Sequence, residues 1–347
     1  KKGQKGRKGR LFGNGSDVRY IFFFEMDPFR LTCSVISFLT NSLLALLIIS
    51  LRIPYFSSFK WYLLALPINN ILYTFALLFM DVHHGIHEEA VFTVSFGILP
   101  GLAGVGVYQS IISNYYSVFF LLFLFRFSLV YKGAYASSSL HGFLSSSTAI
   151  LPTVTFVLVV DLFYFCLPTV FYRPDSFTVD YIAPRMKTLF NKGRDYGYDV
   201  QIIWINRSNG FPYHNFLGAV GTVSIVLISL MSFAFIGRII RRFIRNGPKS
   251  KSKLLRNKEV VIYRILLSQV GVFYLGIASA MTILTIFPFI PSINGIMPYL
   301  SYFFKYSVVL PPAISPLLLF IQLRDIRIAF FNWVKKITSA STNAIEE

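Results

Sequence analysis

Charged side chains are rare inside the apolar stretches of this sequence, and three of them are candidates for chemistry. Arg126 closes the run "LFLFRFSLVY" at residues 122–131, Asp161 lies in the middle of a second run, and Lys305 lies in a third. Because a charge at the centre of a bilayer costs at least about 2.5 kcal/mol, such residues usually face a protein interior and serve a function. We expect Asp161 to be protonated or paired. We expect Lys305 either to reach toward the membrane edge or to line a ligand pocket.

A second candidate is a short polar stretch that contains His83, His84, His87, Glu88 and Glu89. Imidazole and carboxylate groups are common metal ligands, so a metal site is conceivable here. No second cluster of such residues fixes a ligand spacing. We therefore interpret the stretch as a solvated loop and expect no metal site.

Catalytic arrangements are missing from the rest of the sequence. Both cysteines, Cys33 and Cys166, lie in apolar runs, which argues against a disulfide framework and a thiolate metal site. We find no nucleophile with a nearby base, no metal-ligand spacing and no phosphate-binding loop. The sequence therefore predicts neither an enzyme nor a bound cofactor.

The apolar runs predict the architecture that positions these residues. Hydrophobic residues make up 54% of the chain and charged residues 14%, and the runs have the roughly 20-residue length that crosses a ~30 Å hydrocarbon core. They are continuous rather than alternating, which indicates helices. The sequence thus predicts an all-α membrane protein, a seven-transmembrane helix bundle. The predicted spans are Phe29–Leu51, Trp61–Val82, Leu102–Ser128, Thr148–Phe171, Phe216–Ile240, Val260–Ile286 and Met297–Leu323.

The distribution of positive charge predicts how the bundle is oriented. The linker at 238–258 holds nine basic residues and no acid. The linkers after the second and sixth spans hold no lysine or arginine. The positive-inside rule therefore places this linker in the cytoplasm and the amino terminus outside. Two N-glycosylation sequons, at Asn14 and Asn206, lie on the side predicted to be extracellular. The net charge of +18 does not indicate a nucleic-acid partner, because the positive residues gather at span ends and in this linker.

The two ends of the chain differ from the bundle. Residues 1–28 are predicted to be a basic, disordered extracellular tail, although its positive charges leave open an inverted bundle with this terminus inside. The bundle occupies residues 29–323. Residues 324–347 are predicted to form an amphipathic cytoplasmic helix with a short tail. Its apolar side holds Ile326, Phe330, Trp333 and Ile337, and its polar side holds Arg324, Arg327, Lys335 and Lys336. Just before it, Pro311, Pro312 and Pro316 bend the last span and are interpreted as a hinge.

Several local motifs sharpen this picture. "LRIPYFSSFKWYLLAL" (51–66) joins the first two spans, "ILPGLAG" (98–104) opens the third, Arg126 closes it, and "SPLLLFIQLRDIR" (315–327) ends the seventh. Together they resemble the nematode serpentine chemoreceptors, especially the superfamily that contains classes H, I, J, D and Str. The resemblance extends from Phe29 to Trp333.

This resemblance implies a G-protein-coupled receptor at the plasma membrane of a sensory neuron, often in its cilium. Such a receptor binds a small environmental chemical in the outer half of the bundle and signals to a heterotrimeric G protein. The ligand-binding residues that we expect are Tyr108, Gln109, Tyr302, Lys305 and Tyr306. The residues that we expect to couple to the G protein are Arg126, Arg241, Arg242, Arg245, Arg324 and Arg327.

Two alternatives stay open from the residues alone. Phe125 precedes Arg126 where rhodopsin-like receptors commonly have an acid. Arg126 is therefore either a residue that extends to lipid phosphates or a contact to the G protein or to a neighbouring span. For the whole chain, the alternative is a ligand-gated channel or transporter, which should place charged residues along a path through the membrane. Only Asp161 and Lys305 are deeply placed ionisable candidates, and their different depths favour the receptor.

Overall fold

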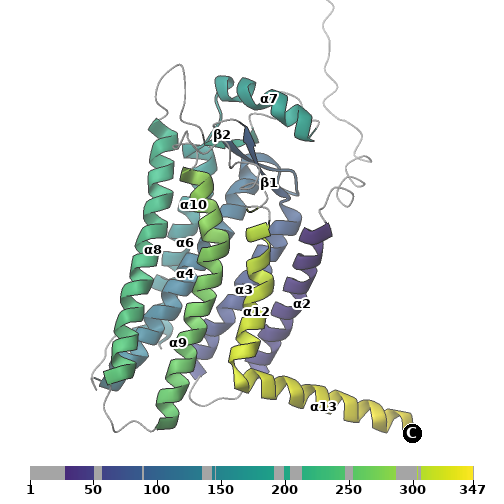
Figure 1. The fold of residues 1–347 in the computed structure, drawn as a ribbon, viewed down its shortest axis with the longest axis vertical. Coiled ribbons are helices and arrows are strands. Elements are labelled where there is room, and N and C mark those ends of the chain that lie inside the picture. Colours follow the sequence, from purple (N-terminus) through teal and green to yellow (C-terminus); the bar gives the residue numbers. More distant parts are fainter. Residues whose placement is uncertain are drawn as a thin grey trace, which may run out of the picture.

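The computed structural model describes residues 28–50, 57–87, 90–134, 143–144, 146–190, 199–203, 213–246, 253–286, 303 and 306–346. Long helices packed side by side make up most of this part of the chain (Figure 1). The bundle consists of α2 (Pro28–Ser50), α3 (Ser57–Phe79), α4 (Gly101–Ala134), α6 (Ile150–Cys166) with the π-helical turn η3 (Leu167–Phe171), α8 (Tyr213–Asn246), α9 (Lys253–Phe273) with the π-helical turn η5 (Tyr274–Ala278) and α10 (Ser279–Ile286), and α12 (Leu310–Gln322). A short 3-10 turn, η2 (Ser147–Ala149), leads into α6.

The predicted spans are confirmed for the first six helices of the bundle. Six helical segments among the described residues are long and apolar enough to cross a membrane. The seventh, α12, has 13 residues, and residues 303, 306 and 307 before it are also helical. The predicted seventh span was Met297–Leu323, and its residues 297–302, 304 and 305 lie outside the described residues.

The third span ends at Ser128, as predicted, but its helix is longer than the span. Helix α4 continues to Ala134. Arg126 therefore does not close the helix; it lies two turns before the end. A helix does not stop where the hydrocarbon stops, because its backbone hydrogen bonds continue as long as no residue breaks them. The sequence 129–134 contains no proline, and its glycine stands in the last turn.

Aromatic rings fill the centre of the bundle around α4. Tyr115 stacks on Phe273 of α9 with ring centroids 4.9 Å apart, and Phe119 lies 5.6 Å from the same ring. Phe123, one turn farther along, contacts Phe233 of α8 at 5.4 Å. Aromatic pairs at such distances contribute about 0.5–1.5 kcal/mol each beyond the area they bury. These rings hold α4, α8 and α9 together.

Prolines in α12 determine a second, polar set of contacts. Pro312 and Pro316 lack an N–H group, so the carbonyl groups four residues earlier, of Val308 and Pro312, have no helical donor. The Tyr73 hydroxyl of α3 donates to the Val308 carbonyl at 2.9 Å, and the Asn41 amide of α2 donates to the Pro312 carbonyl at 2.9 Å. Both of these carbonyls are thus satisfied by a neighbouring helix, as a membrane interior requires.

The same polar set extends across five helices. Asn70 donates to the Asn41 carbonyl oxygen at 2.8 Å and to the Ser315 hydroxyl at 3.2 Å, and it accepts a bond from Tyr115 at 2.7 Å. Gln269 of α9 donates to the Ser315 carbonyl at 2.9 Å and accepts a bond from its hydroxyl. We call these five residues, Asn41, Asn70, Tyr115, Gln269 and Ser315, the amide network. All its members are neutral, which suits a buried site.

Residues 82–87 and 90–95, whose histidines we had placed in a solvated loop, form an antiparallel pair of strands instead, which we call the hairpin. β1 (Val82–His87) pairs antiparallel with β2 (Ala90–Ser95), and β2 pairs antiparallel with β3 (Gln201–Ile203), with Thr93 opposite Gln201. Every residue of β2 is buried. The β-branched and aromatic residues of "AVFTVS" favour a strand that is covered on both faces.

A helix outside the bundle covers this sheet. α7 (Ser176–Phe190) lies above it, at the end of the molecule where α2 begins (Figure 1). Ile182 and Met186 of α7 are fully buried against Phe92, Val94 and Ile202 of the strands. We call this end of the bundle the sheet end.

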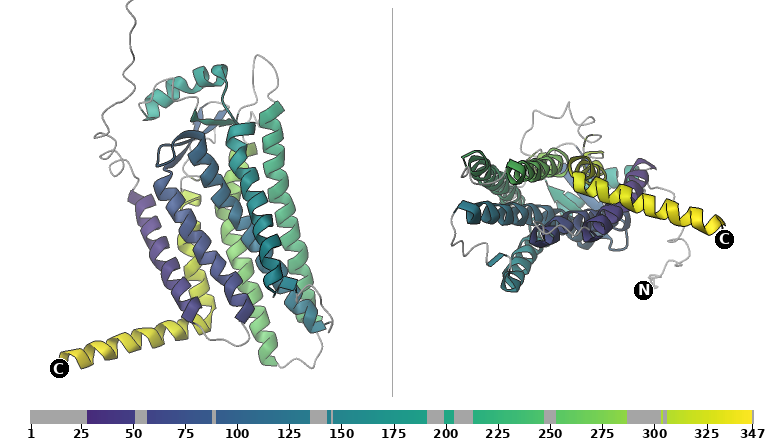
Figure 2. Two further views of the ribbon diagram at one scale, coloured as in Figure 1. Left: turned by 180° about the vertical axis from the view of Figure 1, so that it is seen from behind. Right: turned by 90° about the horizontal axis from the view of Figure 1, so that it is seen from below.

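The predicted amphipathic helix is present at the opposite end. α13 (Arg324–Glu346) turns away from the bundle directly after α12 (Figure 2). Ile326 is 1% exposed, and Phe330 packs edge-on against Phe320 of α12 at 5.3 Å. Arg327 donates to the Ile321 carbonyl at 2.6 Å and so caps α12. We call this end, which also carries the arginines of α8 between residues 238 and 245, the basic end.

Candidate functional site

A small cavity lies between the helices near the sheet end. It has a volume of about 40 Å³. Its lining residues come from α4, α6, η3, β3, α8 and α10: Gln109, Ile112, Tyr116, Tyr164, Leu167, Tyr172, Gln201, Thr222, Met281 and Thr285. None of these side chains carries a charge, and three are tyrosines. We call this the aromatic cavity.

One side chain at the cavity holds an unused hydrogen-bond acceptor. The Gln109 amide of α4 donates to the Gln201 carbonyl oxygen of β3 at 2.8 Å. Its own oxygen, Oε1, is buried and has no hydrogen-bond partner among the described residues. A buried acceptor without a donor costs about 1–3 kcal/mol, so this atom favours a ligand or water that carries a donor.

A backbone hydrogen bond to Tyr172 holds strand β3 beside the aromatic cavity. The Ile202 amide donates to the Tyr172 carbonyl at 3.0 Å, which fixes Gln201 next to η3. Gly218 of α8 lies so close to the Tyr172 ring that a Cβ atom there would come within 2.9 Å of it. A glycine therefore lets α8 approach η3 and close one wall of the aromatic cavity.

The residues predicted to bind the ligand do not all meet at this cavity. Gln109 lines it. Tyr108 lies on the other side of α4, where its hydroxyl donates to that of Tyr73 at 3.1 Å, since Tyr73 uses its own proton for Val308. Tyr306 is 37% exposed and packs edge-on against Phe29 of α2 at 4.8 Å, outside the cavity. Tyr302 and Lys305 lie outside the described residues.

Sequence reasoning missed most of the lining. Tyr116 follows Gln109 by seven residues, so the two share a face of α4, and this spacing could have identified it. Tyr164 and Tyr172 lie on either side of a proline, where the sequence indicates no cavity. Gln201 reaches the site only because β3 pairs with β2, which no local pattern predicts.

Asp161, the deep carboxyl group of the fourth span, has a partner. The Ser113 hydroxyl of α4 donates to its Oδ1 atom at 2.6 Å. Asp161 thus joins α6 to α4 one turn away from Gln109. It does not line the aromatic cavity.

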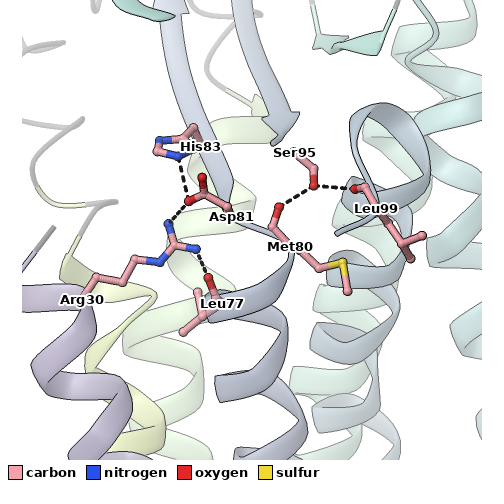
Figure 3. A network of polar contacts seen from close by, with 7 residues as sticks. All are labelled: Arg30, Leu77, Met80, Asp81, His83, Ser95 and Leu99. Carbon is pink, nitrogen blue, oxygen red and sulfur yellow. Dashed lines mark hydrogen bonds and ion pairs between the residues drawn. The ribbon is translucent and has the colours of Figure 1, made fainter. Parts of the chain in front are cut away.

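The sheet end carries an ion-pair network that ties α2 to α3 and β1 (Figure 3). Arg30 lies 3.2 Å from the Oδ1 atom of Asp81 and also donates to the Leu77 carbonyl. His83 lies 2.9 Å from the same Oδ1 atom. Burial by itself raises the pKa of Asp81, but the hydrogen bond and charge of His83, with those of Arg30, lower this pKa below its usual value overall.

The neighbouring histidine is in a different environment. His84 contacts the Thr93 hydroxyl across the hairpin, with Nδ1 3.0 Å from the oxygen. Burial, followed by the charges of His83 and Arg30, lowers the pKa of His84 to about 3. No cluster of three metal-binding side chains occurs among the described residues, and Glu88, Glu89 and the His87 side chain lie outside them.

At the basic end, the predicted coupling residues fall into two groups. Arg126 is only 5% exposed, beside the fully buried Phe125, whose ring stacks on Tyr62 at 4.4 Å. It therefore does not extend into lipid. The others lie at the surface. Arg241, Arg242 and Arg245 are exposed on α8, Arg324 is exposed on α13, and Arg327 caps α12.

The arrangement of the helices defines a class of protein. The fold resembles the crystal structure of squid rhodopsin, with a TM-score of 0.54, 12% sequence identity, and coverage of 88% of this chain and 84% of the rhodopsin chain. This is the seven-helix fold of the G-protein-coupled receptors. A comparison with curated protein sequences gives no match.

The sequence assigns the chain to a family within this class. The profile of the serpentine type 7TM GPCR chemoreceptor Str family matches residues 27–331. The chain belongs to this family and is a multi-pass membrane protein. This confirms the resemblance to the serpentine chemoreceptors and identifies the class as Str.

Proposed function

We propose that this chain is a chemosensory receptor that binds a small neutral chemical in the aromatic cavity and signals to a heterotrimeric G protein at the basic end. The observation that carries the proposal is the lining of the cavity, which combines rings, neutral polar groups and the unused Oε1 acceptor of Gln109. Such a lining suits an apolar molecule with one hydrogen-bond donor, such as an alcohol or an amide. It does not suit an ion, because nothing there balances a charge.

The size of the aromatic cavity supports a mechanism. At about 40 Å³ it holds a few water molecules, whereas a cavity of about 150 Å³ is needed for a molecule such as benzene. A ligand must therefore widen it. Binding then favours whichever helix arrangement has the wider cavity, which is a shift in population between two states.

The continuous helix formed by α9, η5 and α10 connects the aromatic cavity with the amide network. Met281 and Thr285 of α10 line the cavity, and Gln269 of α9 bonds to Ser315 of α12. Between them, η5 packs against α12, and Gly276 faces Pro311 with no room for a side chain. A displacement of α10 is therefore expected to reach α12 and, through it, α13.

The orientation belongs to the same proposal. We place the sheet end outside the cell and the basic end in the cytoplasm, in the plasma membrane of a sensory cell and often in its cilium. The positive charge between residues 238 and 258 supports this side for the cytoplasm. The glycosylation sites at Asn14 and Asn206 remain predictions, because both lie outside the described residues.

The test is signalling by the full-length chain in a cell that carries a G-protein reporter, screened with small neutral chemicals. For an active compound with a hydroxyl or amide donor, Gln109→Leu should raise the half-maximal concentration about three- to tenfold, the effect of one lost hydrogen bond. Tyr306→Phe, outside the aromatic cavity, is the matched control and should leave it unchanged.

Two results would contradict the proposal. If Tyr306→Phe abolished the response while Gln109→Leu did not, the ligand would bind near α12 instead. If the compound evoked a current that persisted without a G protein, the chain would be a ligand-gated channel or transporter.

A further inference from the structure

Four arginines at the end of α8, three of which we expected to couple to the G protein, line a pocket of their own. Arg238, Arg241, Arg242 and Arg245 follow one another at helical spacing, so they lie on one face of α8. All four are exposed, and together they line a pocket of about 350 Å³. This volume lies within the ~300–1,000 Å³ range of small-molecule sites. The lining contains no carboxylate.

This face of α8 points away from the bundle. Ile240, which is fully buried, and Phe233, 4% exposed, lie on the opposite side of the helix. The four arginines are therefore not directed into the space between the helices. A partner that inserted between the helices at the basic end would not meet all four of them.

The same face points toward lipid. Leu227, Met231 and Phe235 are 52%, 65% and 67% exposed and lie in line with Arg238 and Arg242, at spacings of three or four residues. An exposed apolar stripe on a membrane-spanning helix contacts acyl chains. The arginines thus continue a surface that faces the hydrocarbon.

The length of the apolar part places the arginines at the depth of the headgroups. From Tyr213 to Phe235, α8 extends about 33 Å at ~1.5 Å per residue. The hydrocarbon core is ~30 Å thick, and the polar headgroup layers lie directly outside it. Arg238 therefore lies where the headgroup layer is expected to begin.

We propose that these four arginines form a site for a phosphorylated lipid headgroup, one that carries a phosphate monoester in addition to its phosphodiester. A guanidinium group donates two parallel hydrogen bonds to a phosphate, which makes arginine selective for this geometry. Four such groups without a carboxylate exceed what a single phosphodiester neutralises. A headgroup with several phosphates complements them. The site is independent of whether the aromatic cavity binds a chemical.

The test uses the full chain in bilayer discs that contain a fluorescent phosphatidylinositol bisphosphate or, at equal total charge, phosphatidylserine. The wild-type protein should prefer the bisphosphate. Replacing the four arginines by glutamine (R238Q, R241Q, R242Q and R245Q together) should lower its affinity for this lipid by roughly tenfold or more, since each cation near the surface contributes separately. Because these side chains are exposed, the thermal unfolding temperature should stay unchanged, which verifies folding.

Two matched controls separate a built site from general attraction. Glutamine at Arg324, Arg327, Lys335 and Lys336 removes four charges from α13 and should leave the preference for the bisphosphate intact. Lysine at all four α8 positions keeps the charge but removes the forked donors, and should lose the preference while retaining binding to anionic lipid.

Three outcomes would overturn the proposal. Equal binding of the two lipids at equal charge would mean that only general electrostatic attraction acts. Soluble inositol phosphate bound as tightly as the lipid would identify a soluble ligand instead. A glutamine variant that kept its lipid binding but lost its response to purified G protein would show that the arginines contact that protein.

Discussion

At the scale of single residues, the most informative positions are polar groups whose environment the sequence does not reveal. His83 and His84 are adjacent in the chain, yet His83 pairs with Asp81, whereas the His84 ring lies against Thr93 inside the hairpin. Adjacent residues of a strand point to opposite faces, and this alone separates the two. The cluster that suggested a metal site is divided in this way by the strand.

The buried histidine predicts a pH dependence of stability. The pKa of His84 is lowered from 6.5 to about 3, so the folded state keeps the ring neutral while the unfolded state takes up a proton below pH 6.5. The stability of the folded state is therefore complete above pH 6.5 and decreases as the pH falls from there toward 3. The slope is at most about 1.4 kcal/mol per pH unit. Unfolding temperatures of the purified protein, measured from pH 7.5 to 5, should fall.

Substitution of each histidine in turn tests this prediction, with His84 as the test position and His83 as the matched control. His84→Gln should flatten the decrease, and His83→Gln should retain it. Asp81 does not interfere in this window, because its lowered pKa places the loss of its contribution below pH 3.8. An unchanged slope in the His84→Gln protein would mean that another group titrates.

At the scale of elements, α12 shows how one helix determines the side chains of its neighbours. Three prolines in 13 residues would interrupt an isolated helix. Pro311 and Pro312 stand in its first turn, where a missing N–H group breaks no hydrogen bond within α12, and only Pro316 lies in the interior. The hinge interpretation therefore applies to Pro316, whereas Pro311 and Pro312 begin the helix.

The interior proline predicts a coupling with α2 that a double-mutant cycle can measure. Asn41→Leu removes the donor to the Pro312 carbonyl and should destabilise the protein by about 1–3 kcal/mol. In a Pro316→Ala background, the new N–H group can satisfy that carbonyl, so the same substitution should cost about 1 kcal/mol less. The loss of the bond from Asn70 is common to both backgrounds and cancels. Equal costs in the two backgrounds would show that the Asn41 amide does not replace the missing helical bond.

At the scale of the whole molecule, the parts that could be predicted are those that the bilayer dictates. A run such as Ile150–Phe171 has the length and apolarity of a span because a membrane permits little else, and the sequence identifies it without knowledge of its neighbours. The amphipathic helix α13 is equally local, since one turn after another repeats its pattern.

The parts that could not be predicted depend on contacts between distant segments. The burial of β2 depends on α7, which covers this strand from about ninety residues along the chain. The aromatic cavity combines residues from six elements, and of these the sequence identified Gln109 alone. Arg126 was recognised as unusual, but its burial follows from the packing around α4 and not from its position in an apolar run.

The orientation of the whole molecule gives a final prediction. β3 ends at Ile203 and α8 begins at Tyr213, so residues 204–212, with Asn206, connect two points at the sheet end. The linker 247–252 begins about 50 Å away, at the other end of the 34 residues of α8, which rise ~1.5 Å each. A membrane between these two points gives a glycosylating enzyme access to only one of them.

In a cell that glycosylates secreted proteins, Asn206→Gln should therefore remove one glycan. The variant should have a smaller apparent mass than the wild-type protein, and glycosidase treatment should reduce its mass by one glycan less. A sequon introduced into 247–252 should remain unmodified. Asn14 is the second sequon on the predicted outer side, so Asn14→Gln should also remove one glycan. A glycan that appeared only with the introduced sequon would place the basic end outside the cell. It would also separate the headgroup site on α8 from the cytoplasmic leaflet, where anionic lipids are concentrated.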